Sequence, residues 1–194
     1  MKILEDRIRE FGIVKKEEDI LMIDSFLNHQ IDIKLMDEIA KEFKRIFKDA
    51  KPDKILTIES SGIAIASLLS TYYGYCPIVF AKKSDSKNIN DEKYQILEKS
   101  YTRGIECLVQ VSKNYLNEGE NVLIVDDFLA NGEALNSLIE LCKQAKANIL
   151  GCGVVVCKSY QPGLKRIQDM GIRVECLAKI KSLDNDIVEF EEDI

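Results

Sequence analysis

Two adjacent carboxylates, Asp126 and Asp127, are the residues of this sequence best placed to do chemistry. They follow a continuous apolar run, Val122 to Val125, which is typical of a buried parallel strand. A short loop with Gly132 comes next, and a helical pattern begins at Glu133. A strand, paired acids, a small-residue loop and a helix together predict a ligand site at the carboxyl end of a sheet strand.

This order of residue types suits an anionic sugar substrate. The loop can aim its backbone N–H groups at a phosphate, and the dipole at the helix N-terminus favours the same anion. The two carboxylates need different partners, either sugar hydroxyls or a hard cation such as Mg²⁺. The alternative interpretation is an ordinary strand–helix turn that is capped by acids.

Several other kinds of site are excluded or disfavoured. The sequence has no Gly-x-x-x-x-Gly-Lys-Ser/Thr loop, and Gly151-Cys152-Gly153 lacks the third glycine of a dinucleotide fingerprint. His29 is the only histidine, so a Ser–His or Cys–His hydrolase would depend on that residue alone. The six cysteines form no Cys-x-x-Cys pair and sit mostly in apolar runs, which favours reduced core thiols in a cytosolic protein.

Composition predicts one domain over residues 1–194, with enough apolar residues, 46%, to build a core. The net charge of −6 argues against a nucleic-acid partner, which usually requires a basic face. The longest apolar run, Ile149 to Cys157, is far shorter than the roughly 20 residues of a membrane span. No targeting segment is visible, so we expect a cytoplasmic protein with neither a nucleic-acid nor a membrane partner.

The elements expected from periodicity alternate between strands and helices, which predicts an α/β fold with a mostly parallel sheet covered on both faces. Strands are expected at 54–58, 77–81, 105–111, 121–125, 149–156 and 173–180, and an extended segment at 20–26. Helices are expected at 2–11, 34–48, 63–73, 133–146 and 163–170. The polar stretch from Ser84 to Lys99 is expected to be a long functional loop.

Five segments, in order along most of the chain, resemble the type I phosphoribosyltransferases, and among them the bacterial xanthine phosphoribosyltransferases. They are Asp-Ser-Phe-Leu-Asn-His-Gln-Ile-Asp at 24–32, Ile-Glu-Ser-Ser-Gly-Ile-Ala at 58–64, Phe-Ala-Lys at 80–82, Asp-Asp-Phe-Leu-Ala-Asn-Gly at 126–132 and Lys-Ser-Tyr-Gln-Pro-Gly at 158–163. The resemblance implies the type I fold, with a hood over the base site formed mainly from residues 1–33 and the C-terminal segment. It also implies a homodimer.

The resemblance further implies transfer of a phosphoribosyl group from phosphoribosyl pyrophosphate (PRPP) to N9 of xanthine, giving xanthosine monophosphate and pyrophosphate. Mg²⁺ would be held mainly by PRPP, with no dedicated protein site. The PRPP-binding residues implied are Asp126, Asp127, Ala130, Asn131, Gly132, Glu133 and Ala134. Leu21, Asn28 and Lys158 would bind the base, and Ser60, Ser61, Gly62 and Lys82, with Lys83 beside it, would meet pyrophosphate. Tyr101 and Arg103 are candidates for a catalytic loop.

Two features of this pattern matter for mechanism. A strained or cis peptide around Glu59-Ser60 is typical of the family. Many 6-oxopurine transferases carry an aspartate where Ala130 stands, so the pattern supplies no general base. Three alternatives stay open: a hypoxanthine/guanine phosphoribosyltransferase, a non-catalytic PRPP-sensing regulator that binds nucleic acid, and another Mg²⁺-dependent phosphosugar enzyme.

Overall fold

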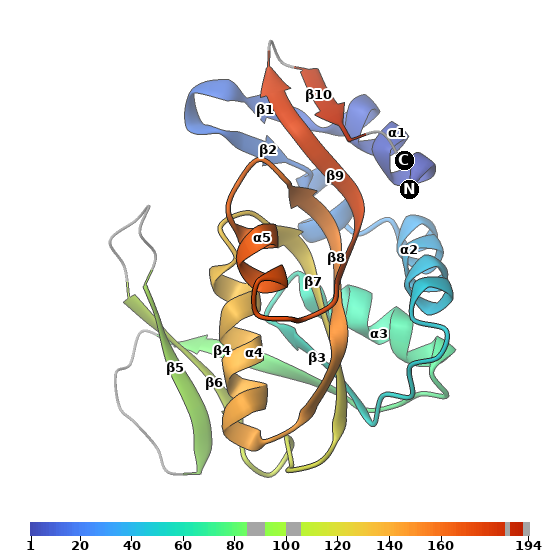
Figure 1. Ribbon diagram of the computed structural model, residues 1–194. Coiled ribbons are helices and arrows are strands. Elements are labelled where there is room, and N and C mark those ends of the chain that lie inside the picture. Colours follow the sequence, from blue (N-terminus) through green and yellow to red (C-terminus); the bar gives the residue numbers. More distant parts are fainter. Residues whose placement is uncertain (85–91, 100–105, 185–186, 192–194) are drawn as a thin grey trace.

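A computed structural model describes residues 1–84, 92–99, 106–184 and 187–191, and it is built around one eight-stranded sheet (Figure 1). The strand order is β10 (Ile187–Phe190), β9 (Val174–Asp184), β8 (Asn148–Lys158), β7 (Asn121–Leu129), β3 (Lys54–Ile58), β4 (Ile78–Ser84), β6 (Glu106–Ser112) and β5 (Lys93–Lys99). The five strands from β9 to β4 are parallel to their neighbours, and antiparallel pairs close both edges. The predicted mostly parallel sheet is confirmed.

Helices cover both faces of the sheet, as predicted. On one side α2 (Ile33–Ile46) packs on α3 (Gly62–Tyr72), which lies against β3 and β7. On the other side α4 (Glu133–Ala145) and the short α5 (Gly163–Gln168) form the covering layer. The helix α1 (Lys2–Phe11) contacts β9 and β10. Each layer buries its own apolar cluster, so the sheet separates two cores.

A small antiparallel hairpin, β1 (Ile13–Lys15) with β2 (Ile20–Met22), stands apart from the main sheet. A π-helical turn at Asp24–Asn28 follows it, so the predicted extended segment at 20–26 is wrong beyond residue 22. The turn replaces the strand because it buries Phe26 and Leu27 together in the core. In Figure 1 the hairpin lies near the end of β8 and the segment that leads into α5.

Two boundaries of the main sheet differ from the prediction. The strand expected at 121–125 continues to Leu129 because Phe128 and Leu129 still pair with Val156 and Cys157 of β8. The two acids therefore lie inside a strand. The loop expected from 84 to 99 is wrong at 93–99, where β5 pairs with β6 and packs Tyr94 and Ile96 against the α4 layer. The rest of that segment, residues 85–91, lies outside the described structure.

The six cysteines are free thiols, and Cys142, Cys152 and Cys157 are buried, as expected for core residues. Burial raises the pKa of Cys142 to about 12, so this thiol is protonated at neutral pH. Among the helices that the structure describes, none combines the length and the apolar character needed to cross a membrane.

Candidate active site

The paired acids lie inside β7, near its carboxyl end, and β7 is in the middle of the sheet. Asp126 is 3% exposed and Asp127 is 8% exposed. The backbone N–H of Asp127 donates to Oδ1 of Asp126 over 3.0 Å. Burial, together with the charge of Asp127, raises the pKa of Asp126 well above 3.8. Two adjacent buried carboxylates need partners for their charge. A cation or a set of hydroxyl donors bound there would stabilise that charge.

Lys83 acts on Asp126 through its charge. Its charge opposes the rise in the pKa of Asp126. Its Nζ lies 3.2 Å from Oε1 of Glu98 on β5, and its backbone N–H donates to Oε1 of Glu59 over 2.8 Å. These contacts join the ends of β3, β4 and β5 beside the acids.

Lys82, the predicted pyrophosphate ligand, lies on the other face of β4, because successive strand residues point to opposite sides. It lines a cavity of about 480 Å³ together with Ile78 and Phe80, and its Nζ lies 5.9 Å from the centre of the Phe80 ring. These contacts of Lys82 do not include either of the paired acids. Its role in binding pyrophosphate stays a prediction.

Two glycines set the shape of the loop that follows β7. Gly132 precedes α4 with φ of 88°, a left-handed conformation that strongly favours glycine. Gly163, at the start of α5, donates its backbone N–H to the Ala130 carbonyl over 3.1 Å. A Cβ on Gly163 would lie 2.3 Å from that oxygen and 2.8 Å from the nitrogen of Gly132. The loop is thus held from outside by the α5 backbone.

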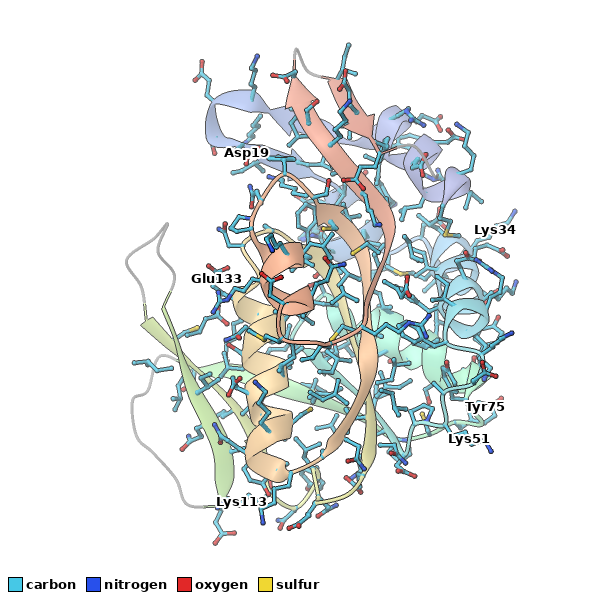
Figure 2. The ribbon with its side chains drawn as sticks, viewed as in Figure 1. Asp19, Lys34, Lys51, Tyr75, Lys113 and Glu133 are labelled. Atoms are coloured by element: carbon cyan, nitrogen blue, oxygen red, sulfur yellow. The ribbon has the colours of Figure 1, made fainter. Side chains whose placement is uncertain are left out.

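The loop leads directly into α4, so the predicted phosphate-binding residues 130–134 are brought together. The first-turn N–H groups of a helix have no intrahelical acceptors, and the dipole adds positive potential there. Glu133, labelled in Figure 2, is the first residue of α4. It lines a smaller cavity of about 200 Å³ together with Arg166 of α5. The arrangement can hold an anionic group through backbone donors.

The turn after β3 carries the predicted pyrophosphate residues. The Glu59-Ser60 peptide is cis, as the family resemblance implied. Ser61 precedes α3, and a Cβ on Gly62 would lie 1.9 Å from Oγ1 of Thr57, so only glycine fits there. This turn and the end of β7 meet at the same edge of the sheet because β3 and β7 are parallel neighbours.

Lys158 ends β8 and is 4% exposed. Its ammonium donates to the backbone carbonyl of Asp19 and lies 3.5 Å from Oδ2 of the same residue. Burial lowers the pKa of Lys158, and the Asp19 carboxylate opposes that shift. The predicted base-binding lysine therefore sits beneath the β1–β2 hairpin, in a buried position with a carboxylate beside it.

Asp19 contacts three side chains, one at the end of β8 and two in the segment that follows it. Besides Lys158, Tyr160 donates its hydroxyl to Oδ1 over 2.6 Å, and Gln161 donates its Nε2 to Oδ2. Figure 2 labels Asp19 between the hairpin and this segment. The sequence reasoning missed Asp19, Tyr160 and Gln161. Only the quoted segment 158–163 carried a signal for the last two, and nothing in the sequence pointed to Asp19.

The two other predicted base-binding residues differ in position. Leu21 lies on β2, two residues after Asp19, and is buried with the main core. Asn28 ends the π-helical turn and is exposed. Both belong to the region expected to cover the base, and their roles stay predictions. Tyr101 and Arg103 lie outside the described residues.

The donor set fits a hard cation that is shared with a substrate. Asp126 and Asp127 offer carboxylate oxygens, the ligand type that Mg²⁺ prefers when it also keeps water and phosphate ligands. Within the described ranges no cluster of three or more His, Cys, Asp or Glu side chains could hold a metal. The residues thus suit an ion that arrives with a polyphosphate, and the Mg²⁺ requirement stays a prediction.

Comparison with known proteins matches residues 22–189 to the phosphoribosyl transferase domain family. The chain is 50% identical over 190 residues to "Xanthine phosphoribosyltransferase" of Clostridioides difficile (strain 630), covering 98% of this chain and 100% of that protein. It is 48% identical over 193 residues to the protein of the same name from Alkaliphilus metalliredigens (strain QYMF), covering 100% of this chain and 95% of that one.

Solved structures show the same fold at lower identity. Adenine phosphoribosyltransferase from Thermoanaerobacter pseudethanolicus aligns with a TM-score of 0.72 at 19% identity, over 91% of this chain and 99% of that one. The Saccharomyces cerevisiae adenine enzyme gives 0.70 at 24% identity, over 91% and 99%. These likenesses concern the fold alone. The chain belongs to the phosphoribosyltransferase family, and it is similar over nearly its whole length to members named xanthine phosphoribosyltransferase.

Proposed function

We propose that the protein transfers the 5-phosphoribosyl group of PRPP to N9 of xanthine, releasing pyrophosphate and forming xanthosine monophosphate. The full-length similarity to proteins named xanthine phosphoribosyltransferase supports this choice of base. One structural observation carries the reaction type: two buried carboxylates in the last part of β7 are followed, after two apolar residues, by a loop that leads into a helix N-terminus. That order suits a sugar with hydroxyls at one end and a phosphate at the other.

At the sugar end, Asp126 and Asp127 hold the ribose 2′ and 3′ hydroxyls, directly or through Mg²⁺. The backbone donors of residues 130–134 hold the 5′-phosphate, and the turn of Ser60, Ser61 and Gly62 receives pyrophosphate. As pyrophosphate leaves, the anomeric carbon gains positive charge. Buried carboxylates stabilise that charge because they act in a region from which water is excluded.

At the base end, Lys158 donates to the 6-oxygen of xanthine. A buried donor at this position rejects a 6-amino group, since a donor facing a donor leaves both unpaired. Asn28 donates to the 2-oxygen, and Leu21 packs against the ring. Ala130 offers no carboxylate to the purine, and we propose that xanthine, an acidic purine, reacts as its anion without a protein base.

Mg²⁺ would enter with PRPP and be held mainly by it. Residues 1–33 and the C-terminal segment cover the base. The enzyme acts as a homodimer. Symmetric dimers are the commonest closed assemblies of soluble proteins. Sedimentation of the purified protein tests the assembly, and a monomer at micromolar concentration would contradict this part of the proposal.

A panel of purine bases with PRPP and Mg²⁺ tests the function. We expect xanthine to give the highest kcat/KM, guanine and hypoxanthine lower values, and adenine none. Faster turnover of hypoxanthine than of xanthine would contradict the base assignment. Titration of PRPP into the protein at millimolar Mg²⁺ tests the reaction class independently, because a protein that binds no PRPP cannot be a phosphoribosyltransferase of this kind.

A further inference from the structure

Gln161 occupies a defined place beside the base-binding lysine. It lies three residues after Lys158, in a turn in which the backbone N–H of Gln161 donates to the carbonyl of Lys158 over 3.0 Å. Both side chains contact one atom, Oδ2 of Asp19: the ammonium of Lys158 lies 3.5 Å away, and the amide nitrogen of Gln161 donates to it. The amide and the ammonium are therefore neighbours.

The contact with Asp19 fixes which way the amide of Gln161 points. An ionised carboxylate can only accept hydrogen bonds, so the NH₂ group of the amide must face Asp19. The amide oxygen must then face away from the carboxylate. That oxygen, Oε1, is buried, and it has no hydrogen-bond partner among the residues that the structure describes. A buried acceptor without a donor is unfavourable, and a ligand N–H would relieve that cost.

We propose that Gln161 is a specificity-determining residue whose Oε1 accepts the N1–H of the purine while Lys158 donates to the adjacent 6-oxygen. This inference rests on the proposed function. A 6-oxopurine presents an acceptor at O6 and a donor at N1, which matches a donor at Lys158 and an acceptor at Gln161. A 6-aminopurine presents the reverse order, so both contacts would fail together.

Asp19 is the positioning residue for this pair. Its carboxylate holds the amide of Gln161 in one of two possible orientations, and its backbone carbonyl and carboxylate place the ammonium of Lys158. Tyr160 gives the carboxylate a further donor on Oδ1. Without Asp19, the amide could rotate and present NH₂ to the base.

A purely structural role is the rival explanation. In that case Gln161 would only tie the hairpin to the end of β8, and its loss would weaken the fold and affect every base equally. The two explanations differ in one ratio, the preference for xanthine over 1-methylxanthine, because methylation removes the N1 proton and leaves O6 in place.

The experiment measures kcat/KM for xanthine and for 1-methylxanthine, at saturating PRPP and Mg²⁺, in the wild-type protein and in Gln161→Met. We expect the variant to lose about tenfold on xanthine, as when a neutral hydrogen bond is removed, and little on 1-methylxanthine, so that the preference falls by about tenfold. The KM for PRPP should stay within about threefold. Gln168→Met, at the exposed end of α5, is the matched control and should preserve the preference.

An unchanged preference in Gln161→Met, with the xanthine rate lowered or not, would overturn the inference. Asp19→Asn gives a second test should Gln161→Met fold poorly, because an asparagine amide can face either atom of Gln161. We expect a smaller fall in the same preference, and no fall would count against the inference. If the wild-type protein used no 6-oxopurine at all, the proposed function itself would be wrong, which the first measurement reveals separately.

Discussion

The two ends of the candidate site are built in different ways. At the sugar–phosphate end, the acids, the loop and the first turn of α4 come from one continuous stretch, residues 126–134. At the base end, Asp19 comes from the hairpin, and its partner Lys158 is 139 residues away in the sequence. The first end presents mainly backbone donors and two acids, whereas the second presents side chains on separate elements.

This difference indicates which substitutions can alter recognition at each end of the site. A phosphate held by main-chain N–H groups is recognised by the path of the backbone, which side-chain substitutions alter little. A purine held by an ammonium and an amide is recognised by side-chain chemistry, which a single substitution alters. We therefore expect PRPP binding to be sensitive to backbone shape and base choice to be sensitive to side-chain type. The following experiments test that division.

Removing both acids should have the largest effect. We expect Asp126→Asn with Asp127→Asn to lower kcat by at least about 10³-fold, because the developing positive charge on the sugar loses its buried carboxylates. The circular dichroism spectrum should not change. Asp49→Asn, at an exposed position, is the matched control and should keep full activity. A double variant that retained a tenth of the wild-type rate would contradict the role of the pair.

A methyl group at Gly163 should damage the sugar–phosphate end through the backbone. The new Cβ would meet the carbonyl of Ala130 at 2.3 Å, so the loop must shift. Since a misplacement of about 1 Å can cost about 10²-fold, we expect Gly163→Ala to raise the KM for PRPP by that order. Binding of xanthosine monophosphate should weaken with it, because the product keeps the same 5′-phosphate. Normal PRPP kinetics would show that the loop does not depend on α5.

Replacing Lys158 should affect the base end alone. Lys158→Met removes a buried charged donor, and we expect kcat/KM for xanthine to fall by about 10- to 100-fold, the range for a hydrogen bond to a charged group. The KM for PRPP should stay within about threefold. Lys165→Met, on an exposed side chain of α5, serves as the control. Equal losses for base and PRPP would break the proposed division between the two ends.

The smallest effect concerns stability and its dependence on pH. The pKa of Asp126 is raised in the folded protein, so the fold binds that proton more tightly than the unfolded chain does. The contribution of Asp126 to the free energy of unfolding is present at acid pH. It is lost as the pH rises from about 3.8 through the pKa of Asp126 in the folded protein. Asp126→Asn removes the ionisable group, and we expect a gain of about 1–2 kcal/mol at pH 7. Thermal unfolding from pH 4 to 8 measures it, and the gain should shrink toward pH 4.

Local patterns in the sequence were enough to predict the strand and the helix of the sugar–phosphate end, and the roles of its residues stay predictions. The apolar run before the acids and the helical spacing after Gly132 both arise from neighbouring residues, and the structure has them nearly as expected. The predicted end of β7 was four residues too early. Pairing with β8, a tertiary interaction, continues the strand through the acids. The strand β5 was not predicted because the segment that contains it is mostly polar. Tyr94 and Ile96 nevertheless show the alternation of a half-buried strand.

The base end could be predicted only in part. Lys158 follows a long apolar strand, which indicated its place at the edge of the sheet. Asp19 sits among charged residues of a short hairpin, and no local rule distinguishes it from its neighbours. Its left-handed conformation, with φ of 50°, and its contacts with the segment after β8 depend on how distant parts of the chain meet. Such long-range contacts leave no periodic pattern in the sequence, so they cannot be predicted from it.

The six residues from Lys158 to Gly163 join the two ends of the site. The first is fastened to the hairpin through Asp19, and the last is fastened to the loop through the carbonyl of Ala130. A segment anchored at both extremities cannot be lengthened or shortened without disturbing two substrates at once. Attempts to redesign base preference should therefore exchange its side chains one for one, and any library that varies its length should yield mainly inactive proteins.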